Sequence, residues 1–191
     1  MNKLYFSLIL LLAGLFSNLA YAQPKKGEFI NVSAGIGLVA PYDEADVTGS
    51  GFYAQGEYVW APRTWFAVRP YAGLIIASGE SETVEVAPGV KEYIKSNAFL
   101  IGGKVRIAAP IPYVAPFLET GVGMSLGSFE TSTQFVHIKK SGALVHIPFT
   151  LGLAIGKRHG TEVKFTYYYH NSVEQFSGAV AVGFSIPLNE D

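Results

Sequence analysis

The chain has 191 residues, of which 49% are hydrophobic, with a formal net charge of −1 and no cysteine. The balanced charge and the lack of a lysine and arginine cluster argue against nucleic acid as a partner. Without cysteine, the chain has no disulfide scaffold, no cysteine-linked lipid anchor and no thiolate metal site. Beyond residue 22 it also lacks an unbroken apolar run of about 18 residues, so no transmembrane helix is predicted.

Residues 1–22 are predicted to be a secretory signal peptide. Lys3 supplies the positive charge, Leu4–Phe16 the apolar run, and Ala20-Tyr21-Ala22 the small residues expected before a cleavage site. We therefore expect residues 23–191 to form one exported domain.

Eight segments follow in which every second residue is apolar. This pattern is typical of strands with one face in hydrocarbon and the other in a polar lumen. Helices would need apolar spacings of three and four residues, which are missing here. The pattern predicts an all-β fold, an eight-stranded antiparallel up-and-down transmembrane β-barrel. In chain order, the expected strands are Glu28–Ala40, Gly51–Trp60, Trp65–Ala77, Asn97–Ala109, Pro116–Leu126, Ala143–Gly156, Glu162–His170 and Ser177–Leu188.

The connections alternate between short and long. The short ones carry proline or glycine at the bend, namely Ala61–Thr64, Pro110–Pro112 and Lys157–Gly160. The long ones are polar, namely Pro41–Ser50, Ser78–Ser96 and Gly127–Gly142, and a fourth, short one is Asn171–Phe176. Short periplasmic turns and long external loops are typical of outer-membrane barrels, so we expect both termini in the periplasm.

A soluble eight-stranded barrel or sandwich is the alternative, and its apolar face would point inward. Two features favour the membrane barrel. The polar face is rich in glycine, alanine and serine, which suits a narrow lumen, and the apolar face continues through all eight segments. Aromatic residues near the strand ends are also placed like two interfacial girdles: Tyr58, Trp60, Trp65, Phe66, Tyr113 and Phe117 at one level, and Tyr42, Phe52, Phe99, Tyr167 and Tyr169 at the other.

The charged residues within the strands fall on the lumen face. The short turns should bring Glu57 close to Arg69 and Lys104 close to Glu119. The interior of an eight-stranded barrel is just wide enough for side chains to fill, and an unpaired buried charge costs several kcal/mol. We therefore expect an ion-pair plug, with a narrow pore as the alternative. The charges are Glu57, Arg69, Lys104, Arg106, Glu119, Glu162 and Lys164.

Over residues 23–188 the chain resembles the small outer-membrane β-barrel proteins of the OmpA/OmpX type. The segment Phe184–Leu188 looks like the C-terminal strand by which such proteins are recognised for membrane assembly. The chain departs from the family pattern in Asn189-Glu190-Asp191, because the family usually ends at or near an aromatic residue. The resemblance implies the fold and the outer-membrane location more than it implies an activity.

A weaker resemblance is to lipid A deacylases of the acyloxyacyl hydrolase type. The segment Pro116–Gly123 is similar to a strand of that family, and Tyr169–Ser172 lies where the family has its His-x-Ser-Asn motif. The resemblance implies His170 as the base and Ser172 as the nucleophile. Val173 stands where the family has Asn, no acidic residue aligns with the third catalytic member, and Glu174 is the only nearby acid. Strand alternation also turns His170 inward, whereas that family works from the lipid-facing side, although a bulge beside the loop could turn it outward.

Two of the histidines should lie opposite each other across the turn at 157–160, His146 and His170. A transition-metal site needs a third ligand, for which His137 is the only obvious candidate. Rim histidines without a metal are the simpler interpretation.

We therefore expect a non-enzymatic outer-membrane barrel with a filled lumen and a structural or surface-interaction role, without metal or cofactor. The expected partners are outer-membrane lipid and lipopolysaccharide, the barrel-assembly machinery, and an extracellular ligand at the long loops. The acidic stretch Glu80–Glu85 could bind a divalent ion or a partner, and a solvated loop is the simpler interpretation. The alternatives are a lipid A 3-O-deacylase-like esterase that uses Ser172 and His170, and a narrow pore.

Overall fold

The structure is a computed structural model that describes residues 26–43, 47–81, 92–133 and 137–190. The predicted signal peptide and the acidic stretch from Glu82 to Glu85 lie outside the described residues. The strands are β1 (Gly27–Pro41), β2 (Gly49–Arg63), β3 (Phe66–Ser81), β4 (Glu92–Ala108), β5 (Val114–Ser132), β6 (His137–Ile155), β7 (Thr161–Tyr169) and β8 (Gln175–Glu190).

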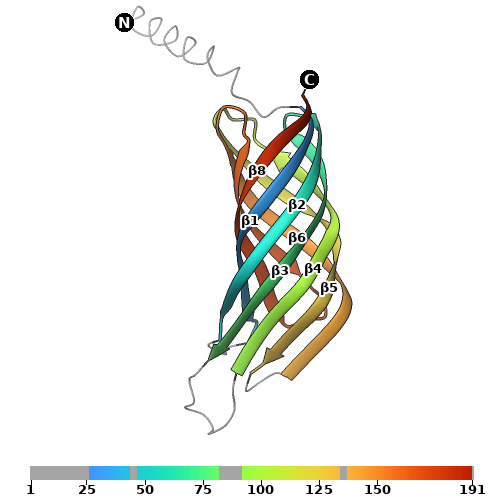
Figure 1. The fold of residues 1–191 in the computed structure, drawn as a ribbon, viewed down its shortest axis with the longest axis vertical. Coiled ribbons are helices and arrows are strands. Elements are labelled where there is room, and N and C mark those ends of the chain that lie inside the picture. The colour runs from blue at the N-terminus through green and yellow to red at the C-terminus, as the bar shows by residue number, and fades with distance from the viewer. Residues whose placement is uncertain (1–25, 44–46, 82–91, 134–136, 191) are drawn as a thin grey trace, which may run out of the picture.

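All of these strands belong to one closed barrel in which each strand pairs with its neighbours in sequence order. The barrel closes where β1 pairs antiparallel with β8, for example at Gly35 and Ala181. Figure 1 shows this closure as the blue β1 beside the red β8. The predicted eight-stranded antiparallel barrel is therefore confirmed. Within the described residues, no helix has the length and apolar character needed to cross a membrane.

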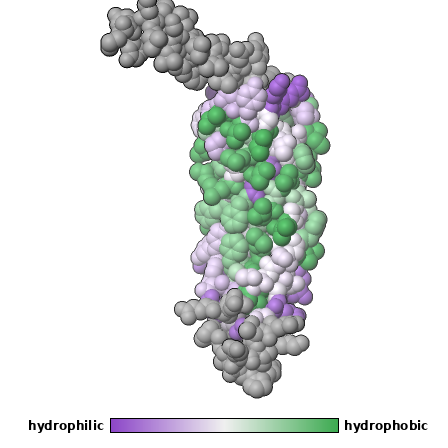
Figure 2. All heavy atoms as spheres, turned by 90° about the vertical axis from the view of Figure 1, so that its left-hand side faces the viewer, coloured by the Kyte–Doolittle hydropathy of each residue, from purple (hydrophilic) through white to green (hydrophobic). Residues whose placement is uncertain are grey.

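The outer surface of the barrel is apolar. Leu118 and Leu151 are each 59% exposed and Val122 is 63% exposed, although Leu118 and Leu151 are paired with each other and Val122 is paired with Gly103 of β4. Figure 2 shows the result on one face, a broad hydrophobic band between more hydrophilic ends. A soluble barrel would bury these side chains, because exposing so large an apolar surface to water is unfavourable. The apolar face thus points outward, as the membrane-barrel interpretation predicts.

The aromatic residues predicted to form girdles point outward with one exception. Trp60 and Trp65 near the short turns are each 50% exposed, and Tyr42 near the long loops is 51% exposed. At the long-loop end Phe176 stacks on Tyr167 with ring centroids 5.2 Å apart. The prediction for Phe117 is wrong: its side chain is 3% exposed and lies inside the barrel. Its position in β5 shares the inward face with Glu119, so strand alternation outweighs its aromatic character.

Several strands are longer at the long-loop end than the sequence pattern predicts. The expected third loop, Gly127–Gly142, is mostly a β-hairpin, because Gly127–Ser132 of β5 pairs with His137–Gly142 of β6. A loop was expected because the alternation of apolar residues stops after Leu126 and resumes at Ala143. The strands continue because the backbone ladder needs no apolar outer face where outward side chains such as Lys139 meet water, while Phe129 and Thr131 stay buried on the lumen side.

Candidate functional site: the filled lumen

Glu57 lies at the centre of a buried ion-pair network inside the barrel. Its carboxylate is 2.5 Å from Arg69 Nε, 2.9 Å from Lys104 Nζ and 2.7 Å from Lys164 Nζ. These partners come from β3, β4 and β7, so one carboxylate ties together four strands. Gln55 adds a short hydrogen bond from its amide to Glu57 Oε1.

Two further carboxylates extend the network toward the short turns. Glu119 accepts hydrogen bonds from Lys104 Nζ and Arg106 Nε, each at 2.7 Å. Glu162 accepts two from the Arg106 guanidinium, at 2.6 and 2.9 Å. Arg69 reaches both acids, at 3.1 Å from Glu119 and 3.2 Å from Glu162. The predicted pairing of Glu57 with Arg69, and of Lys104 with Glu119, is therefore confirmed.

Seven charged side chains thus share the middle of the lumen, and all are buried. Each carboxylate touches at least two cations, which offsets the cost of removing it from water. The four basic groups exceed the three acidic groups by one. The network joins β2, β3, β4, β5 and β7 across the lumen, and its side chains fill the space in which a pore would run.

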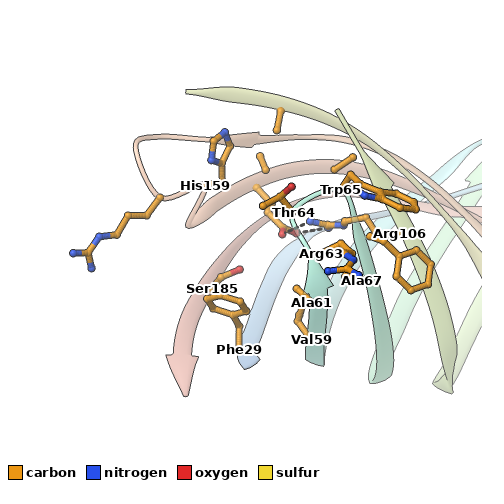
Figure 3. Close-up of a pocket in the computed structure, with 16 residues that line it drawn as sticks. Phe29, Val59, Ala61, Arg63, Thr64, Trp65, Ala67, Arg106, His159 and Ser185 are labelled. Carbon is orange, nitrogen blue, oxygen red and sulfur yellow. Dashed lines mark hydrogen bonds and ion pairs between the residues drawn. The ribbon is translucent and has the colours of Figure 1, made fainter. Parts of the chain in front are cut away.

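A small cavity of about 80 Å³ lies between this network and the short turns (Figure 3). Arg106 and Glu162 line its inner side, and Thr64, Trp65 and His159 lie nearer the turns. The Arg106 guanidinium carbon also sits 3.5 Å from the centre of the Phe117 ring. Because Arg106 is already engaged by two carboxylates and one aromatic ring, the cavity offers no free cation on its inner side.

On the other side of the network the lumen becomes apolar. Tyr53 and Tyr168 begin this half: their hydroxyls are 2.9 Å apart, and both donate to Gln55 Oε1. Beyond them is a continuous cluster of buried side chains that extends toward the long loops and includes Val39, Ile75, Ile94, Leu100 and Phe129. The lumen is therefore closed twice, by ion pairs in one half and by apolar packing in the other.

A hydrogen-bonded chain of two histidines and a serine crosses this apolar half. His146 Nε2 is 2.5 Å from the Tyr71 hydroxyl, and His146 Nδ1 is 2.8 Å from Ser125 Oγ. The same serine oxygen is 2.8 Å from His170 Nε2, and His170 Nδ1 is 3.1 Å from the carbonyl oxygen of Tyr168. The two imidazole centroids are 5.5 Å apart, so the predicted facing of His146 and His170 is confirmed.

The chain has one consistent assignment of protons when both rings are neutral. A carbonyl oxygen only accepts, so His170 Nδ1 carries a hydrogen and its Nε2 accepts from the Ser125 hydroxyl. Ser125 Oγ then accepts from His146 Nδ1–H, and His146 Nε2 accepts from the Tyr71 hydroxyl. Every ring nitrogen has a partner, and no carboxylate is in contact with either ring among these bonds.

Gly123 makes room for this chain. A Cβ at this position would lie 2.3 Å from the Tyr71 hydroxyl and 2.5 Å from His146 Nε2. His137, the only candidate considered for a third metal ligand, lies at the start of β6, where its Nδ1 is 3.1 Å from Ser132 Oγ. Within the described residues, no group of three histidine, cysteine or acidic side chains is arranged to hold a metal ion.

Comparison with known proteins shows that the chain resembles solved structures in its fold. No protein-family model matches the chain, and no curated protein matches it. Among solved structures, Neisserial surface protein A has a TM-score of 0.55 at 10% identity, over 85% of this chain and 98% of that one. The outer membrane protein OprG from Pseudomonas aeruginosa has a TM-score of 0.53 at 10% identity, over 86% and 98%.

The fold is that of the small outer-membrane β-barrels. The predicted resemblance to proteins of the OmpA/OmpX type is thereby confirmed for the fold. At this level of identity the similarity extends to architecture, and the roles of individual residues have to come from the chain itself.

The three residues considered for an esterase lie in different surroundings, one inside the lumen and two on an exposed turn. His170 is buried, and both of its ring nitrogens are engaged within the lumen, by Ser125 and by the Tyr168 carbonyl. Ser172 and Glu174 are exposed on the turn between β7 and β8. The Glu174 carbonyl oxygen accepts a hydrogen bond from the backbone N–H of Tyr42 at 3.3 Å. Catalysis by His170, Ser172 and Glu174 stays a prediction.

Sequence analysis did not find the apolar half of the lumen or the role of Ser125. A signal for the first is present: Leu74-Ile75-Ile76 and Phe99-Leu100-Ile101 interrupt the alternation with an apolar residue on the lumen face. Ile75 and Leu100 are fully buried there. Ser125 carries no comparable signal, because glycine and serine occupy many other lumen positions.

Proposed function

We propose that the protein is an integral outer-membrane β-barrel with a closed lumen, which acts as a structural element of the envelope or presents its external loops to a partner. The observation that carries the proposal is the combination of an apolar outer belt with a lumen blocked by ion pairs. Glu57, Glu119 and Glu162 each bind buried cations inside the barrel, while Leu118, Val122 and Leu151 are exposed outside it.

The proposed location includes export by residues 1–22 and a periplasmic position for both termini. The start of β1 and the end of β8 lie at the same end of the barrel as the short turns (Figure 1). Short turns are usual on the periplasmic side of outer-membrane barrels, which supports this orientation. Outer-membrane lipid and lipopolysaccharide would surround the belt, and the barrel-assembly machinery would insert it.

The test of location is fractionation. The protein should appear in the outer-membrane fraction and should migrate faster on denaturing gels before boiling than after it, because a closed barrel has no strand edge for detergent to enter within the belt. Recovery as a soluble periplasmic protein would contradict the proposal.

The test of the closed lumen is conductance across a planar lipid bilayer. The purified protein should insert without opening stable ion channels, since the charged plug and the apolar cluster both lie across the path. Steady channels in the wild type that disappear when the lumen is altered would favour the narrow-pore alternative. Hydrolysis of lipid A would favour the esterase alternative.

A further inference from the structure

A groove runs over the outer face of the barrel beside the short turns, across β4 to β8. Its volume is about 700 Å³, and ligand sites in proteins usually measure about 300–1,000 Å³. Two rows of outward apolar side chains form its walls, and the members of a row lie side by side on neighbouring strands. The row farther from the turns is Ile107, Leu118, Leu151, Phe165 and Val180. The nearer row is Ala109, Pro116, Leu153 and Val163.

The floor of the groove is the backbone between these two rows, at Phe117, Gly152 and Lys164. The side chains of Phe117 and Lys164 are buried in the lumen, and Lys164 Nζ is held there at 2.7 Å from Glu57 Oε1. Backbone N–H and C=O groups in the middle of a sheet bond to the neighbouring strands. The lining residues therefore offer apolar contacts, which suit a hydrocarbon chain and leave a polar group without partners.

Two exposed cations lie at the turn where the groove ends, Lys157 and Arg158 between β6 and β7. Lys157 follows Leu153 of the nearer wall by four residues, which is no more than about 14 Å along the chain. Residues 156–161 contain no acidic residue, and the next one, Glu162, is buried in the ion-pair network. A ligand whose chain enters the groove therefore meets two positive charges at this end of it.

The other short turns lack this combination of groove and charge. The turn between β4 and β5, Pro110–Pro112, contains no charged residue. The turn between β2 and β3 has Arg63, but no residue of either of those strands lines the groove. The basic pair at positions 157 and 158 and the groove thus coincide at one place on the barrel.

A second copy of the chain is a poor occupant of the groove. Two copies in one membrane that meet at their grooves would be related by a two-fold axis along the membrane normal. This symmetry would bring both pairs of Lys157 and Arg158 to the same level beside the contact, where they repel each other. An occupant with a negative charge near the membrane surface and an apolar chain within the belt fits the same place without this repulsion.

We propose that the groove and the turn together bind one anionic phospholipid of the periplasmic leaflet, with an acyl chain between the two rows and its phosphate at Lys157 and Arg158. Ammonium and guanidinium groups donate charge-assisted hydrogen bonds to phosphate oxygens, and basic residues at the membrane surface favour anionic lipids. Tyr113 is exposed beside the same turn, where its carbonyl oxygen accepts a hydrogen bond from Gly156 N–H, and its phenol lies at the level of the lipid head group.

This inference rests on the proposed function, since it needs the apolar belt in a bilayer and the short turns on the periplasmic side. It deepens that function by assigning one lipid class to one place on the belt. The negative charge of the lipid decides the class, because a zwitterionic head group brings its own ammonium close to the two cations.

The test is native mass spectrometry of the complete mature protein, released from detergent micelles that contain phosphatidylglycerol or phosphatidylcholine with identical acyl chains. The wild type should retain one molecule of phosphatidylglycerol, with an affinity about tenfold higher than for phosphatidylcholine. The preference should shrink as salt is added before the measurement, because the cations are exposed. Gel migration before boiling shows whether each sample is folded.

The contribution of charge is measured with the double variant Lys157→Gln and Arg158→Gln, which should bind the two lipids equally. The matched control is Arg63→Gln, which removes an exposed arginine at the turn between β2 and β3, away from the groove. The control should keep the preference for phosphatidylglycerol.

The contribution of the groove is measured with Leu153→Trp, which places a larger side chain in the nearer wall. It should lower the retention of both lipids by about tenfold and leave the ratio between them unchanged. Val122→Trp is the control, because Val122 is equally outward on β5 and does not line the groove. Its lipid retention should match that of the wild type.

Three results would overturn the inference. They are equal retention of the two lipids by the folded wild type, an unchanged preference in the Lys157 and Arg158 double variant, and a dimer without lipid as the main species. Insertion into vesicles is measured separately. A folded protein that inserts and shows no lipid preference contradicts this inference alone, whereas a protein that does not insert contradicts the proposed function.

Discussion

Arg69 and Glu57 face each other inside the barrel with the guanidinium Nε 2.5 Å from a carboxylate oxygen, and neither side chain has any exposed area. Arg69 is also the one cation of the seven-residue network that contacts all three carboxylates, since it reaches Glu119 and Glu162 as well. The closure of the lumen therefore depends on Arg69 more than on the other cations.

Replacing Arg69 with methionine should destabilise the barrel strongly. The substitution keeps much of the side-chain volume and leaves three buried carboxylates with fewer cations, a loss that typically costs about 3–5 kcal/mol. Denaturant unfolding of the detergent-folded protein measures this difference. The control is Glu130→Gln, which breaks the exposed pair with Lys139 and should cost less than about 1 kcal/mol. Equal effects of the two substitutions would contradict the importance of the buried network.

Leu151→Arg tests the outward belt. Leu151 lies on the outer face in the middle of the paired part of β6, and an arginine at the bilayer midplane of such barrels costs about 2–4 kcal/mol. The variant should unfold at lower denaturant concentration and assemble poorly in cells. The control is Ala143→Arg, on the same face of β6 but beyond the end of β7. Near the membrane–water interface the cost of an arginine falls to about 0–1 kcal/mol. If Ala143→Arg is the more harmful, the position of the belt is wrong.

Gly152 is a position where strand alternation alone gives the wrong expectation. As a lumen-facing glycine, it should accept serine without difficulty. In the structure a Cβ at this position would lie 2.3 Å from Phe117 Cζ and 2.8 Å from the Val163 carbonyl oxygen. Gly152→Ser should therefore lower stability by about 1–3 kcal/mol, the usual range for overpacking.

Gly103→Ser, on the outer face of β4, is the control for the introduced side chain itself, because a Cβ at Gly103 meets nothing within 4 Å. Thermal or denaturant unfolding of both variants gives the comparison. The double variant Gly152→Ser with Phe117→Leu should recover part of the loss, since leucine removes the ring atoms that the new side chain meets. A harmless Gly152→Ser would show that Phe117 moves aside at little cost.

The architecture and the belt were predictable because they depend on a local rule. Side chains alternate across a strand, so a residue such as Leu151 identifies its own face and that of every second neighbour. The same rule placed Glu57 and Arg69 in the lumen, and the short turn between β2 and β3 brought them together. These contacts join strands that are adjacent in sequence.

The contents of the lumen were less predictable because they join strands that are far apart around the barrel. Arg69 of β3 meets Glu162 of β7, and Ser125 of β5 meets His170 at the end of β7, and the sequence pattern carries no information on such contacts. Phe117 was placed wrongly for a different reason: its aromatic ring near a strand end suggested a girdle, whereas strand alternation turns it into the lumen, where it packs on Arg106 of the adjacent β4.

The chain of His146, Ser125 and His170 gives a prediction with a spectroscopic measurement. Nitrogen NMR of the imidazoles in detergent micelles should show both rings neutral near pH 7, with the hydrogen on Nδ1. Ser125→Ala removes the partner of the His146 Nδ1–H donor and of the His170 Nε2 acceptor. Each of these buried groups, once unsatisfied, lowers the free energy of unfolding by about 1–3 kcal/mol. Ser128→Ala is the control, since Ser128 is only partly buried. Rings that carry the hydrogen on Nε2 would contradict the assigned chain.

The esterase alternative makes a different demand on His170. A serine nucleophile needs its base within hydrogen-bond reach, about 2.6–3.2 Å, and an acid that orients the base. His170 instead uses Nε2 for Ser125 and Nδ1 for the Tyr168 carbonyl, and Ser172 and Glu174 are exposed on the following turn. We therefore expect that Ser172→Ala leaves lipid A acylation and envelope phenotypes unchanged. Mass spectrometry of lipid A from cells with and without the protein, and with the variant, provides the measurement. If the wild type releases a hydroxy fatty acid and Ser172→Ala does not, the esterase becomes the better interpretation. His170 would then have to leave Ser125 and turn toward the turn between β7 and β8.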